Sequence, residues 1–402
     1  MKYISLGDVN FKLIYILIGG LAKLVAELIL YFFADDIQMN NHPFILGINA
    51  ALGMILAFIP DLILKYKLKN KISKNDELIL LADWRKSKFK KMLKKISIIF
   101  LCCFFDFTQK ILTFLYSIYI INNLWIFDIV FLGAFSFVIL NLKLYNHQYF
   151  SCFFMIIFGI ILNAINVEYN GNLFYSLLLS FLIEICYNLD IVISKYLMDT
   201  LFMTPFQITY IEGIFEFVLN CIFLFIATNK ELKEPPLLID IAKSCKYEEK
   251  TYLDNFYAYW NEFKGAEILA FIVQMFSRAL FNLFGHIIAK DFTPSHAIFL
   301  LMIGEILLAF KDKFDGKKIA SLIIILIEIF MLLVFTEIIE LNFWGLEYNT
   351  KKNIKEREKL LAEMDSKSDD SGDIGTGIQL HELESERTSS RSSLCNECNE
   401  SF

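Results

Sequence analysis

Long apolar windows with almost no charged residues are the strongest constraint on what this chain can fold into. A helix needs about 20 apolar residues to cross roughly 30 Å of hydrocarbon, and many windows of the sequence meet that need. The 402 residues are 56% hydrophobic, while the charged residues gather in a few segments. We therefore expect an all-α integral membrane protein with about ten transmembrane helices.

The first apolar segment is expected to be a retained helix, because it lacks the small-residue cleavage site of a signal peptide. Residues 1–344 are predicted to form the transmembrane domain, with an outer loop at 229–264 that either makes a small cap or lies at the interface. Residues 345–402 become rich in Ser, Asp, Glu and Gly and are predicted to be a disordered cytosolic tail. The predicted helices cover residues 11–34, 43–64, 96–118, 124–142, 149–167, 173–195, 206–228, 265–290, 295–311 and 319–341.

The distribution of Lys and Arg predicts the topology. Residues 65–95 carry twelve basic residues against three acidic ones, which favours the cytosol for this loop. Counting helices from there places both termini in the cytosol. One loop conflicts with the charge rule, because Lys311, Lys313, Lys317 and Lys318 then lie on the outer side.

Charged residues inside apolar segments point to function, because a charge in the bilayer costs a few kcal/mol or more and is tolerated mainly where it faces a cavity or a partner. Polar residues recur every four positions in the eighth segment and share one helix face; they are Gln274, Arg278, Asn282, His286 and Lys290. We expect Arg278, Asn282, His286, Lys110 and Lys23 to bind substrate, with counter-charges or proton acceptors at Asp106, Glu184, Glu27 and Glu305. Lys23 with Glu27, and Asp106 with Lys110, lie one helical turn apart, so purely structural ion pairs are an alternative.

Other motifs have simpler interpretations. Lys290 is expected to be an end anchor, and Glu212, next to Gly213, to serve helix packing. Cys395 and Cys398 form a lone CxxC, which is weak evidence for a metal. We find no Gly-rich phosphate loop, HExxH helix or GxSxG elbow, so we expect neither an enzyme nor a cofactor or metal site.

Ten helices divide into halves of five, residues 1–167 and 173–341, and an odd number of crossings inverts the second half relative to the first. Two stretches of the second half are distinctive. One runs from Lys195-Tyr196-Leu197 through Thr204-Pro205-Phe206-Gln207 to Glu212-Gly213-Ile214-Phe215, and the other contains Phe281-Asn282, Gly285, Ala289-Lys290, Thr293 and Ser295. They resemble the drug/metabolite transporter superfamily, specifically the F-type members of its nucleotide-sugar-transporter-like solute carrier branch. The fourth and ninth helices depart from that family because they are bulky around Gly133 and Gly304.

The resemblance implies a secondary carrier of the Golgi, endoplasmic reticulum or lysosomal membrane, working by rocking of its two halves. We expect the solute to be small, polar and anionic, with the lipid bilayer as the other partner and no nucleic acid; a homodimer is left open. Glu356 with Leu360-Leu361 has the spacing of an acidic dileucine sorting signal, although a short amphipathic helix gives the same pattern. The alternative function is a non-transporting scaffold or receptor that works through its cytosolic tail.

Overall fold

The computed structural model describes residues 4–6, 14–32, 42–69, 88–116, 127–142, 144–166, 173–231, 245–247, 250–262, 267–300, 316–341, 346, 350, 353–354 and 356–361. The chain divides into two units, Met1–Glu347 and Tyr348–Phe402. In the second unit, residues 356–361 are helical, although this segment belongs to the predicted disordered tail. The tail from residue 362 onward lies outside the described residues.

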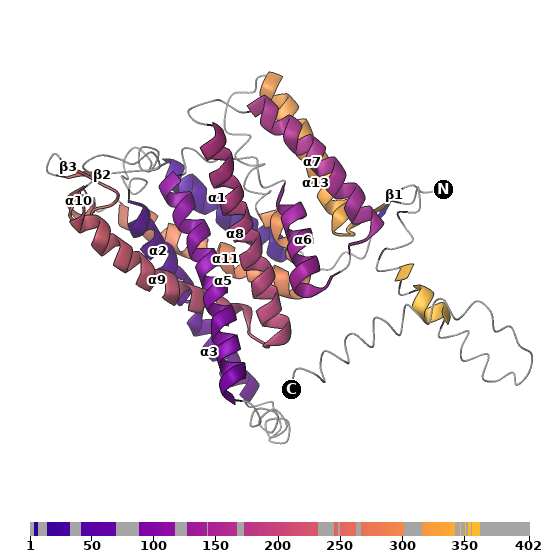
Figure 1. The fold of residues 1–402 in the computed structure, drawn as a ribbon, viewed down its shortest axis with the longest axis horizontal. Helices are drawn as coiled ribbons and strands as arrows, with labels where there is room; N and C mark the ends of the chain where they lie inside the picture. The colour runs from indigo at the N-terminus through magenta and orange to yellow at the C-terminus, as the bar shows by residue number, and fades with distance from the viewer. Residues whose placement is uncertain are drawn as a thin grey trace, which may run out of the picture. The chain divides into compact units, whose positions relative to one another are not determined.

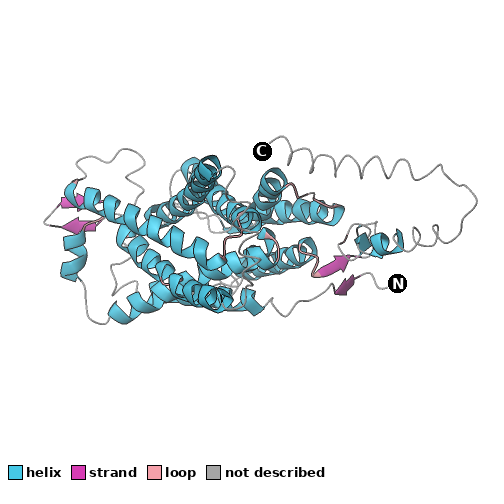
Figure 2. Cartoon of the chain, turned by 90° about the horizontal axis from the view of Figure 1, so that it is seen from below, coloured by secondary structure: helices cyan, strands magenta, loops and turns pink. Residues whose placement is uncertain are grey.

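Helices make up most of the described part of the first unit (Figure 2). By length and composition, five described helical spans could cross a membrane: Pro43–Leu64, Lys95–Thr113, Leu177–Thr200, Pro205–Asn229 and Ile268–Asp291. Shorter apolar helices accompany them, so the described fold is that of a helical membrane protein. The helices are α1 (Ile14–Phe32), α2 (Pro43–Ile55), α3 (Phe58–Lys69), α5 (Lys88–Tyr116), α6 (Asp128–Leu140), α7 (Asn146–Asn166), α8 (Leu173–Thr200), α9 (Pro205–Asn229), α10 (Phe256–Glu262), α11 (Glu267–Asp291) and α13 (Gly316–Phe335), with a 3-10 turn η4 (Pro294–Ala297).

Each predicted segment except the ninth overlaps a described helix along most of its length. The second is broken into α2 and α3 at Leu56 and Ala57, where Pro60 cannot donate a backbone hydrogen bond to the preceding turn. The helix α5 begins at Lys88 rather than at residue 96, so the basic run before the third segment is helical. The ninth segment is described only as far as Leu300.

The α9 helix has its polar side chains inside and its apolar side chains outside. Glu212, Glu216 and Asn220 follow one another at four-residue spacing and are buried, whereas Val218 and Phe225 are exposed. Such an arrangement suits a lipid surround, because hydrocarbon solvates the outer face while the polar groups find partners among neighbouring helices. Its first turn is fixed by a capping box, in which the Thr204 hydroxyl accepts from the Gln207 backbone N–H and the Gln207 side chain accepts from the Thr204 N–H.

Figure 1 shows how the helices pack within the first unit. The helix α1 lies along α11, α5 and α6 lie along α8, and α7 lies along α13. The helix α2 packs against both α9 and α11, and α9 packs against α5 and α11. This arrangement brings α5, α9 and α11 together around α2.

Several contacts show which helix ends lie together. Strand β1 (Ile4–Leu6) pairs antiparallel with β4 (Ile339–Leu341), so the residue stretches before α1 and after α13 meet. The Lys195 ammonium donates to the carbonyl oxygen of Lys290 at 2.9 Å, which joins the carboxyl-terminal parts of α8 and α11. A second strand pair, β2 (Cys245–Tyr247) with β3 (Lys250–Tyr252), precedes α10 within the predicted outer loop.

Glycine lets α2 approach its neighbours at backbone distance. A Cβ on Gly53 would collide with the carbonyl oxygen of Met275 in α11. On the other side of α2, a Cβ on Gly213 of α9 would lie 2.9 Å from the Ile55 backbone nitrogen. These helix crossings therefore need glycine, as close helix contacts in membranes commonly do.

We expect Gly53→Ala to destabilise the protein by about 1–3 kcal/mol, because the methyl group meets backbone rather than a flexible side chain. Unfolding in detergent, followed by circular dichroism against temperature, measures the change. The matched control is Gly285→Ala in α11, where the nearest atom to the new Cβ is Leu300 Cδ1 at 3.8 Å. Equal stability of the two variants would contradict the close crossing.

Candidate functional site

The buried face of α9 supplies two carboxylates to the interior. Glu212 and Glu216 are each 1% exposed and lie one helical turn apart. Glu216 contacts Lys110 of α5 and Glu212 contacts His286 of α11, so α9 lies between two helices that carry basic side chains. These contacts define a central polar cluster, which we take as Cys102, Asp106, Lys110, Asp190, Ser194, Glu212, Glu216 and His286.

Lys110 of α5 is bonded to two carboxylates at once. Its ammonium nitrogen lies 2.8 Å from Asp106 Oδ2 in the same helix and 2.7 Å from Glu216 Oε1 of α9. The Asp106 contact confirms the predicted intrahelical pair, whereas the Glu216 contact joins two helices. With the charge of one ammonium facing two acids, the bonds hold α5 and α9 in register.

His286 of α11 contacts the other carboxylate of α9. Its Nε2 lies 2.9 Å from Glu212 Oε2, and both side chains are nearly fully buried. With Glu212 ionised, the ring N–H is the donor, because a carboxylate only accepts. The polar face of α11, the predicted eighth span, is thus connected to α5, the predicted third span, through the buried face of α9.

Met54 of α2 is fully buried and contacts both Lys110 of α5 and Asn282 of α11. Its sulfur is 3.3 Å from the Lys110 ammonium and 3.1 Å from the Asn282 side-chain nitrogen. A polarisable thioether accepts weakly, so it fills space beside these donors without neutralising them. Further along α2, the Asn49 side chain donates to Gln274 Oε1 at 3.2 Å, which ties α2 to α11 a second time.

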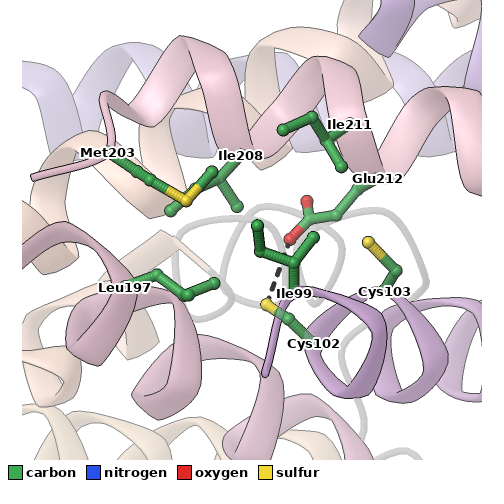
Figure 3. Close-up of a pocket in the computed structure, with 8 residues that line it drawn as sticks. All are labelled: Ile99, Cys102, Cys103, Leu197, Met203, Ile208, Ile211 and Glu212. Atoms are coloured by element: carbon green, nitrogen blue, oxygen red, sulfur yellow. Dashed lines mark hydrogen bonds between the residues drawn. The ribbon is translucent and has the colours of Figure 1, made fainter. Parts of the chain in front are cut away.

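A narrow pocket borders the cluster (Figure 3). Glu212 points across it toward Cys102, whose thiol lies 3.5 Å from Glu212 Oε1 and 3.2 Å from Asp190 Oδ1. The space between its lining atoms, open solvent included, is about 160 Å³, but nowhere is it wide enough for a water molecule. Cys102, Asp190 and Glu212 bring one sulfur and carboxylate oxygens within 4.8 Å of one another, a donor set that could hold a cation. The residues that line the pocket are Ile99, Cys102, Cys103, Leu197, Met203, Ile208, Ile211 and Glu212.

A second polar group, the Asp128 cluster, consists of Lys23, Asp128, Glu184 and Asn188. The Asn188 side chain donates to Asp128 Oδ1 at 2.6 Å, and both residues are fully buried. Asp128 also interacts electrostatically with Glu184 of α8 and Lys23 of α1. The cluster therefore joins α6, α8 and α1.

The structure brings some predicted site residues together and separates others. Lys110 and Asn282 both contact Met54, Asp106 is bonded to Lys110, and His286 is bonded to Glu212. Lys23 and Glu184 belong instead to the Asp128 cluster. Arg278 is half-buried on α11 and Lys290 is exposed near its end, as expected for an anchor. Glu27 lies in α1 with its side chain outside the described atoms, and Glu305 lies outside the described residues.

Sequence reasoning missed several residues of these clusters. Glu212 is predicted to serve packing, and the structure adds its partners on two other helices, His286 of α11 and Cys102 of α5. Glu216, one helical turn from Glu212, is not among the expected site residues. Neither Asp128 nor Asp190 is among them. A carboxylate inside an apolar window was the signal for both.

We expect Lys110→Met to destabilise the protein by about 3–5 kcal/mol, because it leaves two buried carboxylates without their cation. Adding Glu216→Gln to that variant should recover part of the loss. Thermal unfolding in detergent measures both. The matched control is Lys290→Met, whose side chain is exposed; equal stability of the two single variants would show that Lys110 is not a structural counter-charge.

Comparison of the sequence with protein-family models finds no match, and comparison with curated proteins finds none either. The likeness to drug/metabolite transporters therefore stays an expectation based on short sequence stretches. Function has to be argued from the two buried polar clusters and from the way the helices pair.

Proposed function

We propose that this protein is a secondary carrier that moves a small polar solute across an endomembrane by alternating access. The observation that carries the proposal is the central polar cluster, in which Glu216 and Glu212 of α9 bond Lys110 of α5 and His286 of α11. Charged residues inside membrane helices are costly, and they usually mark ion, proton or substrate pathways. A purely structural role would be met more cheaply by apolar packing.

The helix pairing supports ten spans in two inverted halves. We number the spans α1, α2 with α3, α5, α6 and α7, then α8, α9, α11, the segment that starts at η4, and α13. In an inverted repeat, each span corresponds to the span five positions away in this numbering. This correspondence converts the α1–α11 pair into α8–α5, and the α2–α11 pair into α9–α5, and all four pairs are in contact. The pairs α2–α9, α6–η4 and α7–α13 convert into themselves and are also in contact. Such exchange is the expected property of an inverted repeat.

The position of the cluster fits that proposal. Within it, α5 contributes Cys102, Asp106 and Lys110, α8 contributes Asp190 and Ser194, α9 contributes Glu212 and Glu216, and α11 contributes His286. Met54 of α2 lies beside Lys110 and Asn282. The helices α2, α5, α9 and α11 are the second, third, seventh and eighth spans, a set that exchanges with itself when every span is moved by five, and the sixth span, α8, packs against α5 and α11. A binding site between two repeats likewise draws on helices of both halves.

The charges of the cluster favour a cationic or amine-bearing solute, or a proton, over the anion expected from the sequence. Four carboxyl groups, those of Asp106, Asp190, Glu212 and Glu216, accompany Lys110 and His286. Lys110 is already bonded to two of them, so it offers little attraction to an anion. Glu212 also lines the adjoining pocket, and Asp190 lies close to it on the far side of Cys102.

Topology and location belong to the same proposal. The β1–β4 pairing supports an even number of crossings, because it holds the two ends of the first unit together. The basic loop at 65–95 favours the cytosol for the side that also carries both termini. An endomembrane location follows from the family resemblance and is tested by imaging a tagged chain with organelle markers.

In liposomes, we expect the purified protein to take up a labelled organic amine in response to a pH gradient. Glu212→Gln should lower that uptake about tenfold or more, because one charge-assisted hydrogen bond contributes about 1.5–3 kcal/mol. The matched control, Glu231→Gln, changes a carboxylate outside the spans and should transport normally. Uptake no faster than in empty liposomes would refute the carrier.

A labelled nucleotide sugar is the second probe in the same assay. Uptake of this anion but not of the amine would keep the carrier and overturn the assignment of solute charge. In that case Arg278→Ala, rather than Glu212→Gln, should abolish uptake.

Deleting residues 348–402 separates the carrier from a scaffold that works through its tail. The deletion removes the second unit as a whole, so we expect the remaining chain to keep its full rate of uptake. Loss of the cellular phenotype together with unchanged uptake would show that the tail has a task of its own.

A further inference from the structure

Three metal-ligating side chains meet in the part of the chain that joins α2 to the predicted outer loop. His42 immediately precedes α2, Cys245 opens strand β2, and Asp254 precedes α10. Cys245 and Asp254 are close in sequence, but His42 precedes both by more than two hundred residues, so no local motif predicts the trio. All three are buried, with exposed fractions of 0%, 5% and 0%.

The donor atoms of the trio are close enough to share one ion. His42 Nδ1 lies 2.7 Å from Asp254 Oδ1, and the ligand atoms of His42, Cys245 and Asp254 all lie within 4.8 Å of one another. Tetrahedral zinc holds ligands at about 2.0–2.3 Å, which separates them by roughly 3.5 Å. The histidine–aspartate distance would therefore open slightly on binding.

The surroundings fix the orientation of two ligands. Asp254 Oδ2 accepts the backbone N–H groups of Phe44 and Ile45 at 2.8 and 3.3 Å, which leaves Oδ1 directed at His42. The Tyr259 ring packs edge-on against the imidazole, with 5.3 Å between centroids. Outer contacts of this kind hold metal ligands in place before the metal arrives.

We propose that His42, Cys245 and Asp254 bind a zinc ion that fastens strand β2 and the start of α10 to the amino end of α2. A nitrogen, a sulfur and a carboxylate oxygen together form a ligand set that suits zinc better than calcium or magnesium, which prefer oxygen alone. A histidine–aspartate hydrogen bond connects these segments even without a metal, and the buried thiol adds a third ligand within reach of the same ion. Cys245 is not part of a disulfide. The inference stands independently of the transported solute.

The test is metal titration of the purified full chain in detergent, carrying Cys395→Ser and Cys398→Ser so that the tail CxxC cannot contribute. After dialysis against a chelator, we expect one equivalent of Co²⁺ to bind and to give the near-ultraviolet charge-transfer band of a cobalt–thiolate bond. Zn²⁺ should displace the cobalt and raise the unfolding temperature. Absence of the band from this chain would overturn the proposal without recourse to further variants.

Cys245→Ser should remove the band and weaken zinc binding at least about tenfold. Cys221→Ser, which changes a cysteine of α9 outside the trio, should leave both unchanged. His42→Gln is the second variant, should the serine substitution impair folding. A band that persists in Cys245→Ser, or that is lost in Cys102→Ser instead, would place the metal elsewhere and overturn the assignment.

Discussion

A lysine held between two carboxylates in apolar surroundings is the interaction on which the rest of the fold depends. In a medium of low dielectric constant, a charge without a partner costs several kcal/mol, so Lys110 cannot leave Asp106 and Glu216 without penalty. Because Glu216 belongs to α9, this requirement fixes how far α5 can slide or rotate against it. Glu212, one helical turn away on α9, then lies opposite His286, so the position of α9 also fixes the position of α11. One ion pair thus sets the relation of three helices that are distant in sequence.

The same physics explains the arrangement of apolar residues. No hydrophobic driving force holds helices together within lipid, so close packing and polar contacts have to do so. The α9 helix follows that rule, with Glu212 and Glu216 inside and Val218 and Phe225 outside. A soluble protein needs the opposite distribution. The exposed apolar faces and the buried charges therefore have the same cause, because the hydrocarbon of the bilayer solvates apolar side chains and does not solvate charges.

The sequence predicted most of the helices, because apolar length is a local property that the bilayer thickness imposes. It also located the Asp106–Lys110 pair, which depends on spacing within one helix. It could not predict which helix supplies the carboxylates that bond Lys110 and His286, since that depends on packing between distant segments. Glu212 illustrates this limit: the sequence predicts a role in helix packing, but only the fold shows that its partner is His286. Its neighbour Gly213 serves packing as well, so the two contacts lie side by side in α9. Position along a helix reveals a face but not what that face meets.

The glycine contacts of α2 carry a consequence for movement. At Gly53 the helix touches the backbone of α11, and at Gly213 the backbone of α9 touches α2. Backbones in such contact have no side chains between them that could rearrange to let one slide past the other. A span from the first half of the sequence is therefore locked to two spans from the second. In a carrier with this packing, the bodies that move would be interleaved, each drawing helices from both halves, and the boundary between them would pass elsewhere than between residues 167 and 173.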